Sequence, residues 1–282
     1  MTQRLFHQLD VFSAVPLLGN PLAVVHAAQG LSDATMAAFA RWTNLSETTF
    51  LLPPQDPAAD YRVRIFTPGG ELPFAGHPTL GSCWAWLAAG GQPRQASLVV
   101  QECGVGLVRV RRSGPAGQRL AFAAPPLRRS GGVDETLLAQ VAAGLGLARS
   151  DIVAAAWCDN GPGWCAVMLR SAADVLALQP DAALLGDVKL GIVGPHPAGS
   201  ACAFEVRALY REPRGLTEDP VTGSLNAGVA QWLIGAGLVP TAYVAAQGAA
   251  LGRAGRVHVQ QDGPDIWVGG DVVACVQGTV AL

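Results

Sequence analysis

The most informative segment of this chain is Arg64-Ile65-Phe66-Thr67-Pro68-Gly69-Gly70-Glu71-Leu72-Pro73-Phe74-Ala75-Gly76-His77-Pro78-Thr79-Leu80-Gly81-Ser82. Its pattern occurs twice. Tyr61-Arg62-Val63-Arg64 is echoed by Phe204-Glu205-Val206-Arg207, with 143 residues between the two final arginines. His77-Pro78-x-x-Gly81-Ser82 is echoed by Asp219-Pro220-x-x-Gly223-Ser224, at a separation of 142 residues. Two motifs that keep nearly the same separation indicate an internal duplication rather than a chance match.

Each copy predicts a strand, a turn rich in Gly and Pro, and then a helix. The helices expected at residues 78–89 and 224–233 carry no charged residue on any face. An apolar helix in a globular protein is surrounded by protein, so each half is expected to wrap strands around one central helix. Strands and helices mix without strict alternation, which favours the α+β class with two pseudo-symmetric domains.

The rest of the chain predicts a strand-rich protein with a linker near residues 125–132, which are rich in Pro, Gly and Arg. We expect an N-terminal domain at 1–126, which a C-terminal strand near 272–282 can join, and a C-terminal domain at 127–271. The active site is expected in the cleft between them. Strands are expected at 4–12, 21–26, 50–52, 61–66, 97–101, 105–111, 119–123, 152–158, 164–169, 189–193, 203–210, 256–260, 266–270 and 272–280, and further helices at 33–42, 134–144 and 171–178.

The composition narrows the classes of function. Of the 282 residues, 50% are hydrophobic and 14% are charged, with a net charge of −2, so no basic surface for nucleic acid is expected. The uncharged stretch from residue 220 to 252 contains too many polar residues and glycines to span a membrane. No signal peptide is recognisable at the N-terminus, so the sequence predicts a cytoplasmic protein.

The cysteines and the lysine content bear on cofactors. Six cysteines are scattered without a Cys-x-x-Cys motif, which predicts buried free thiols in a reducing compartment. Lys189 is the only lysine and sits in a strand-like run, which disfavours a pyridoxal-phosphate Schiff base. His196 and His258 have no further histidine or carboxylate at the spacing of metal ligands. We therefore expect neither a cofactor nor a metal.

Three residues are candidates for chemistry. Glu47, between Ser46 and Thr48, suits a half-buried general acid or base, although it could equally be a surface carboxylate at the start of a strand. His77 follows Gly76 at the end of a turn, and its alternative role is to cap a helix. Asp219 could likewise be no more than a helix N-cap.

The duplication adds weight to two of these candidates, because it makes His77 and Asp219 equivalent residues at the N-termini of the two central helices. If the halves face each other, both helix dipoles and their free N–H groups favour an anionic, carboxylate-bearing ligand. Ser82, Ser224 and the N–H of Gly223 are further candidate donors to that ligand.

At these residues the chain resembles the PhzF (phenazine-biosynthesis-like) family, which is related in fold to diaminopimelate epimerase. The resemblance runs nearly from end to end. It is carried by Asp10-Val11-Phe12, Gly19-Asn20-Pro21-Leu22-Ala23-Val24-Val25, Asn44-Leu45-Ser46-Glu47-Thr48, Arg64-Ile65-Phe66-Thr67-Pro68, Glu71-Leu72-Pro73-Phe74-Ala75-Gly76-His77-Pro78-Thr79-Leu80-Gly81, Glu218-Asp219-Pro220-Val221-Thr222-Gly223-Ser224, Gln247-Gly248, Gly252-Arg253 and Trp267-Val268-Gly269-Gly270.

The resemblance implies two pseudo-twofold domains, a homodimer, and cofactor-independent isomerisation of a compound such as trans-2,3-dihydro-3-hydroxyanthranilate. In that family the acidic residue at the position of Glu47 removes and returns a carbon-bound proton. Residues at the positions of Gly76, His77, Asp219 and Ser224 line the site and bind polar groups of the substrate.

Related epimerases and proline racemases use two cysteines, which fall near Ala75 and Asp219 here. Neither position is a cysteine, which favours a single carboxylate that moves one proton. Two alternatives remain: an epimerase or racemase of another amino or hydroxy acid, and a non-catalytic protein that binds small molecules on the same scaffold.

Overall fold

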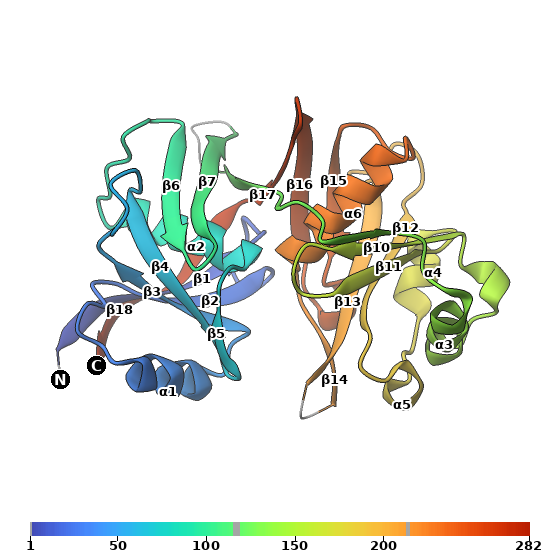
Figure 1. Ribbon diagram of the computed structural model, residues 1–282, viewed down its shortest axis with the longest axis horizontal. Coiled ribbons are helices and arrows are strands. Elements are labelled where there is room, and N and C mark those ends of the chain that lie inside the picture. Colours follow the sequence, from blue (N-terminus) through green and yellow to red (C-terminus); the bar gives the residue numbers. More distant parts are fainter. Residues whose placement is uncertain (1, 115–118, 213–214) are drawn as a thin grey trace. The chain divides into compact units, whose positions relative to one another are not determined.

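The computed structural model describes residues 2–114, 119–212 and 215–282. The chain divides into two compact units: residues 1–123 with 269–282 form the first unit, and residues 124–268 form the second. The boundaries expected from the sequence, after residues 126 and 271, lie three residues further along the chain in each case. Helices and strands are mixed in both units (Figure 1), so the class is α+β, as predicted.

The first unit contains helices α1 (Asp33–Thr43) and α2 (Gly76–Ala88) and strands β1 (Gln3–Val11), β2 (Asn20–Val25), β3 (Glu47–Leu52), β4 (Tyr61–Thr67), β5 (Gly70–Leu72), β6 (Leu98–Cys103), β7 (Gly106–Ser113), β8 (Arg119–Ala123) and β18 (Val272–Ala281). The second unit contains helices α3 (Glu135–Leu145), α4 (Ala172–Ala177), α5 (Ala182–Leu185) and α6 (Gly223–Gly235) and strands β9 (Arg129–Gly131), β10 (Ala154–Asp159), β11 (Trp164–Met168), β12 (Lys189–Pro195), β13 (Phe204–Glu212), β14 (Gly215–Glu218), β15 (Ala242–Gln247), β16 (Gly255–Asp262) and β17 (Asp265–Gly270), whose last two residues belong to the first unit.

The two units share one strand topology. In the first, β18, β1, β2, β3 and β4 are neighbours in that order; β4 then pairs with β5 and, in parallel, with β6, which continues to β7 and β8. In the second, β9 to β13 follow the same order, and β13 pairs with β14 and, in parallel, with β15. The parallel steps also match, since β2 with β3 corresponds to β11 with β12.

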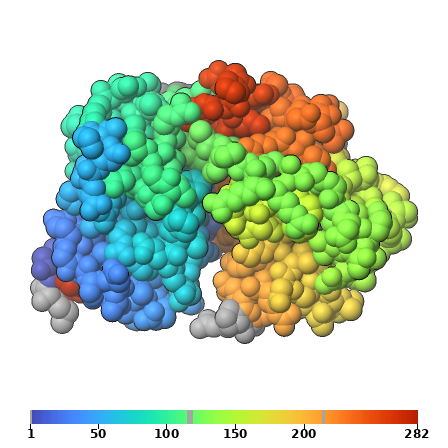
Figure 2. All heavy atoms as spheres, in the orientation of Figure 1, coloured from blue at the N-terminus to red at the C-terminus, as the bar shows by residue number. Residues whose placement is uncertain are grey.

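The first strand of the first unit is paired with the last strand of the chain. β18 runs antiparallel to β1 from Gln3 to Val11, and Thr2 and Leu282 exchange two backbone hydrogen bonds, so red C-terminal atoms lie beside the blue N-terminal strand in Figure 2. The C-terminal strand therefore completes the sheet of the first unit.

An arginine–glutamate pair marks the same place in both copies. Arg64 on β4 binds Glu71 on β5 through two hydrogen bonds of 2.6–2.7 Å. Arg207 on β13 binds Glu218 on β14 in the same way, at 3.1 and 2.7 Å. The two arginines are 143 residues apart, but the two glutamates are 147 apart, because the second hairpin is longer. Equivalent residues of the two copies are therefore 143 positions apart before the hairpin and 147 positions apart after it.

Helix α2 is enclosed by the strands of its own unit (Figure 1) and contacts β1–β4, β6–β8 and β18. It has to approach β2 closely: a Cβ atom on Gly81 would collide with the side chain of Leu22. Gly228 holds the equivalent place in α6, where a Cβ atom would collide with the carbonyl oxygen of Cys158 on β10. The absence of charge on these two helices thus correctly predicted that they lie inside.

The remaining helices cover the outside of the strands. Helix α1 packs Met36, Phe39 and Ala40 against Phe50 and Phe66 of β3 and β4. In the second unit, α3, α4 and α5 share one apolar cluster with β11, β12 and Leu209 of β13. Each unit therefore has a central helix on one face of its strands and outer helices on the other.

Several short elements escaped prediction. These are β5, β9, β14, β15 and α5. Three of the strands have only three or four residues, too few to show a period of two. Strand β15 reads Ala-Tyr-Val-Ala-Ala-Gln and does not alternate between apolar and polar residues, and β9 lies in the segment predicted as a linker. Among the described residues, no helix is long and apolar enough to cross a membrane.

Candidate active site

Glu47 and His77 form a buried pair in the first unit. Glu47 is the first residue of β3, where it pairs with Leu22 of β2. His77 is the second residue of α2, and its Nδ1 lies 3.3 Å from Oε2 of Glu47. The His77 side chain is 4% exposed, and the Glu47 side chain is 14% exposed. The structure thus brings together two of the three predicted catalytic residues.

The other ring nitrogen of His77 faces a backbone carbonyl. Nε2 lies 3.4 Å from the carbonyl oxygen of Pro21. A carbonyl only accepts hydrogen bonds, so the tautomer with its hydrogen on Nε2 satisfies Pro21 and leaves Nδ1 as an acceptor for a protonated Glu47. Burial lowers the pKa of His77 to about 3, which keeps the ring neutral near pH 7. In that tautomer Nδ1 presents a lone pair to Glu47, and it can accept a hydrogen bond from the carboxyl group when that group carries a proton.

Asp219, the third predicted catalytic residue, lies in the second unit in the turn between β14 and α6. Its Oδ2 accepts a 2.5 Å hydrogen bond from Oγ1 of Thr222. The turn is organised by the buried amide of Gln247, whose Nε2 donates to the Asp219 carbonyl at 3.1 Å and to Oγ1 of Thr222 at 3.0 Å. Oε1 of Gln247 accepts from the Thr222 N–H at 3.0 Å and from Nδ2 of Asn226 at 2.8 Å. One side chain therefore fixes both ends of the turn.

Gly223 and Ser224, both predicted to bind substrate, are the first two residues of α6. Oγ of Ser224 accepts a 3.0 Å hydrogen bond from Nε1 of Trp164, and its carbonyl accepts a 2.8 Å bond from Nδ2 of Asn160. With the indole as donor, the hydroxyl hydrogen of Ser224 can be donated elsewhere, for example to an anionic ligand.

The two central helices share one property that the others lack. The N-cap residues of α2 and α6, Ala75 and Thr222, make no side-chain hydrogen bond to the first turn. Side-chain oxygens cap the other four α-helices, from Ser32, Asp134, Ser171 and Asp181. The first turns of α2 and α6 therefore keep N–H groups for a ligand, and the helix dipole favours an anion there.

The predicted equivalence of His77 and Asp219 is wrong. Because the hairpin in the second copy is longer, the separation at the helices is 147 residues, so Gly76 matches Gly223 and His77 matches Ser224. The counterpart of Asp219 is Leu72, and the repeated motif reads Glu-x-Pro-x-x-Gly in both copies. Helix α2 also begins two residues before Pro78, where it was expected to start.

Ser82 is not a ligand donor. It is fully buried in α2 and donates a 2.9 Å hydrogen bond to Oγ1 of Thr49. The sequence had paired Ser82 with Ser224, but in the structural register it lies one turn deeper in its helix than Ser224 does.

Three residues that support the site were missed as functional candidates: Gln247, Thr222 and Trp164. In the sequence Gln247 stood out only as part of a family motif. A sign of its role was its position: it is a single amide residue at the end of an apolar strand and precedes a glycine. Nothing in the sequence shows that Trp164 reaches Ser224, because sixty residues separate them.

The cysteines take no part in these clusters. All six are free thiols, and four of them are buried, as expected, whereas Cys103 and Cys275 are half-buried. Burial raises the pKa of Cys158 to about 12 and that of Cys165 to about 11, so both stay protonated near neutral pH. In the described part of the chain, no three His, Cys, Asp or Glu side chains gather in a way that could hold a metal ion.

Comparison with known proteins places the chain in a family. The family of phenazine biosynthesis-like proteins (PhzC-PhzF) matches residues 9–278. Antisense-enhancing sequence 1 of Schizosaccharomyces pombe is 35% identical over 99% of both chains. Trans-2,3-dihydro-3-hydroxyanthranilate isomerase of Pseudomonas aeruginosa is 34% identical over 90% of this chain and 89% of its own.

A solved structure agrees on the fold. The PhzF-family phenazine biosynthesis protein of Enterococcus faecalis covers 100% of both chains, with a TM-score of 0.81 and 22% identity. The fold is thus the diaminopimelate-epimerase-like fold expected from the sequence. Several relatives are named as isomerases. The chain therefore belongs to the phenazine biosynthesis-like (PhzC-PhzF) family and is an enzyme of the isomerase class.

Proposed function

We propose that the protein is a cofactor-independent isomerase that moves a proton within a small carboxylate-bearing substrate similar to trans-2,3-dihydro-3-hydroxyanthranilate. The observation that carries the proposal is the buried pair of Glu47 and His77 at the uncapped start of α2. One carboxyl group next to a neutral imidazole provides one acid–base group with a defined partner for its proton.

The proton transfer follows from the tautomer of His77. Ionised Glu47 removes a proton from a substrate carbon, and the electron pair of the broken C–H bond stays in the conjugated system of the substrate. The new Glu47 hydroxyl donates to the bare Nδ1 of His77, 3.3 Å away, which stabilises the protonated acid. Glu47 then returns the proton to a different carbon of the same system, and His77 remains neutral throughout.

Binding of the substrate is assigned to the uncapped helix starts. In the first unit the N–H of Gly76 suits an anionic group, and in the second unit the N–H of Gly223 and the hydroxyl of Ser224 suit one as well. Asp219 suits an amino or hydroxyl group, because the Thr222 and Gln247 side chains hold its turn in place. The P. aeruginosa relative is named for trans-2,3-dihydro-3-hydroxyanthranilate, which carries carboxylate, amino and hydroxyl groups. This name supports the same substrate class for the present chain.

The lack of a cysteine at the start of either central helix argues against the epimerase alternative. A two-thiol racemase needs a reactive cysteine at the start of each central helix, whereas the N-caps here are Ala75 and Thr222. The residue predicted to match the second cysteine, Asp219, lies three positions before Thr222, and it is not a cysteine either.

The test is to incubate the protein with trans-2,3-dihydro-3-hydroxyanthranilate in heavy water and to follow the ring protons by NMR. The expected result is loss of the substrate signals and growth of a product with a shifted double bond. Unchanged substrate after prolonged incubation with folded protein would contradict the proposed substrate class.

A further inference from the structure

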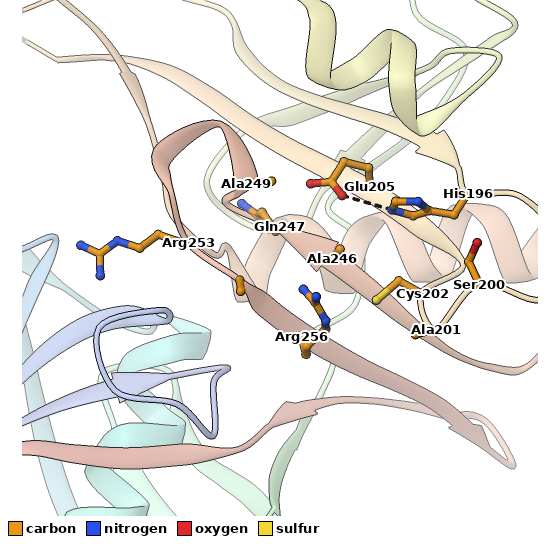
Figure 3. A pocket seen from close by; sticks show the side chains of 11 residues that line it. His196, Ser200, Ala201, Cys202, Glu205, Ala246, Gln247, Ala249, Arg253 and Arg256 are labelled. Carbon is orange, nitrogen blue, oxygen red and sulfur yellow. Dashed lines mark hydrogen bonds and ion pairs between the residues drawn. The ribbon is translucent and has the colours of Figure 1, made fainter.

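The second unit contains a cavity of about 250 Å³ whose lining includes Gln247, the residue that also holds the Asp219 turn. His196, Cys202, Glu205 and Arg256 contribute to its lining (Figure 3). Its floor includes Ala246 of β15. The next residue, Gln247, points its side chain to the other face of the strand, where it bonds Asn226 of α6. Because neighbouring side chains in a strand alternate between faces, the cavity opens on the face away from α6.

The pairing of the strands explains why a cavity forms beside Glu205. Glu205 of β13 pairs with Gly194 of β12 on one side and with Ala246 of β15 on the other. Ala246 in turn pairs with Arg256 of β16. An acid and a base thus stand on one face of the sheet, about 10 Å apart at their Cα atoms, with only a methyl group between them. Small residues on both sides of Glu205 leave the hollow.

The carboxyl group of Glu205 is incompletely satisfied. The residue is 2% exposed, and its Oε2 accepts a 3.1 Å hydrogen bond from Nε2 of His196. Its Oε1 has no hydrogen-bond partner within the described ranges. A buried acceptor without a partner is unfavourable, because it has lost its hydrogen bonds to water. A ligand that brings a donor into the cavity would remove this cost.

The opposite side of the cavity offers a cation. Arg253 and Arg256 both contribute to the lining, and the Arg253 side chain extends away from the carboxylate of Glu205 (Figure 3). Arg256 uses one donor on the Gly255 carbonyl, at 2.8 Å, and a guanidinium has five. The cavity therefore presents one carboxylate acceptor and one set of cationic donors.

We propose that this cavity binds a free α-amino acid, with its ammonium group on Glu205 and its carboxylate on Arg256. An amino acid carries both charges next to each other and satisfies both side chains at once. A simple carboxylate leaves Glu205 without a donor, and a simple amine leaves Arg256 without an anion. Glu205 and Arg256 are not among the residues assigned to isomerisation, and the cavity adjoins that machinery only through Gln247, which also holds the Asp219 turn.

Calorimetric titration with three compounds of one skeleton tests this arrangement. L-Serine has both groups, 3-hydroxypropionate lacks the ammonium group, and ethanolamine lacks the carboxylate. L-Serine is expected to bind saturably at millimolar concentration, and each truncated compound to bind about tenfold more weakly or worse, because a charged hydrogen bond is lost. Absence of L-serine binding, or equal binding of either truncated compound, would overturn the proposal.

Two variants locate the binding. Glu205→Gln and Arg256→Gln should each weaken L-serine binding by about tenfold or more. Their matched controls, Glu212→Gln and Arg211→Gln, change exposed residues at the far end of β13 and should bind as the wild type does. L-Serine binding that survives both cavity variants would place the ligand elsewhere and contradict the assignment. If either variant fails to fold, the three titrations on the wild-type protein still decide the question.

Discussion

Nδ1 of His77 lies 3.3 Å from Oε2 of Glu47, while the opposite nitrogen of the same ring faces the carbonyl of Pro21. This relationship gives the histidine a defined task. It does not exchange protons with the solvent, since burial holds its pKa near 3. It accepts a hydrogen bond from the acid that Glu47 becomes when it removes a proton from the substrate.

Replacement of His77 should therefore slow the proton transfer without abolishing binding. We expect His77→Phe, which cannot accept the hydrogen bond, to lower kcat by about 100-fold, a typical share for one acid–base partner. The KM should change much less, because His77 is assigned no contact with the carboxylate. Steady-state kinetics with trans-2,3-dihydro-3-hydroxyanthranilate measure both constants, with His258→Phe as the control. A KM effect without a kcat effect would show that His77 only binds the substrate.

Gln247 should act through the turn that it holds. In Gln247→Met the Thr222 N–H and Nδ2 of Asn226 lose a common acceptor, which should cost about 1–3 kcal/mol of unfolding free energy. Because the Asp219 turn is then released, kcat/KM should fall in samples that are still fully folded. Urea unfolding and kinetics measure the two effects, and Gln260→Met, on the exposed side of β16, is the matched control. Unchanged kinetics in the folded variant would limit Gln247 to a structural role.

The two equivalent arginines provide an internal comparison. Arg207 and Glu218 are buried, and Arg207 also donates to the carbonyls of Val175 and Leu178. Arg207→Met should cost about 3–5 kcal/mol, because it leaves Glu218 buried without its partner. Arg64 bonds the more exposed Glu71 and Asp33, so Arg64→Met should cost about 1 kcal/mol or less. Equal losses in denaturant unfolding would contradict this explanation.

Acid should destabilise the protein through its buried histidines. Burial lowers the pKa of His26 to about 4, with a further contribution from His7, whose Nδ1 is 2.9 Å away. The unfolded chain binds a proton at this residue near pH 6.5, so the stability is fully present above pH 6.5 and is lost as the pH falls towards 4. The loss from His26 is on the order of 3 kcal/mol. His26→Gln should flatten the pH dependence of the unfolding free energy between pH 6.5 and 4, whereas a curve parallel to the wild type would refute this assignment.

The sequence alone predicted the duplication, the two central helices and most strands, because each of these features leaves a local pattern. Uncharged helices and alternating strands carry their signal within ten residues or so. The pairing of Glu47 with His77 was not visible, since it depends on how β3 and α2 pack together. Both residues were nonetheless selected individually, from turn chemistry and from the family motif.

The mistaken equivalence of His77 with Asp219 has a physical origin. Both are followed by proline, and proline was expected at the start of each helix. In the structure, Pro220 lies in the turn before α6, whereas Pro78 lies within α2. The longer hairpin of β13 and β14 shifts the register by four residues, as the Arg64–Glu71 and Arg207–Glu218 pairs and the helix starts at Gly76 and Gly223 show.

The most direct test of the central claim, that Glu47 carries the proton, is the rate at which Glu47→Gln isomerises trans-2,3-dihydro-3-hydroxyanthranilate. The variant keeps the size of the side chain but cannot accept the proton, so turnover should fall by about 100- to 10,000-fold. The control Glu135→Gln, on the exposed start of α3, should keep the wild-type rate. Turnover by folded Glu47→Gln at the wild-type rate would contradict the mechanism.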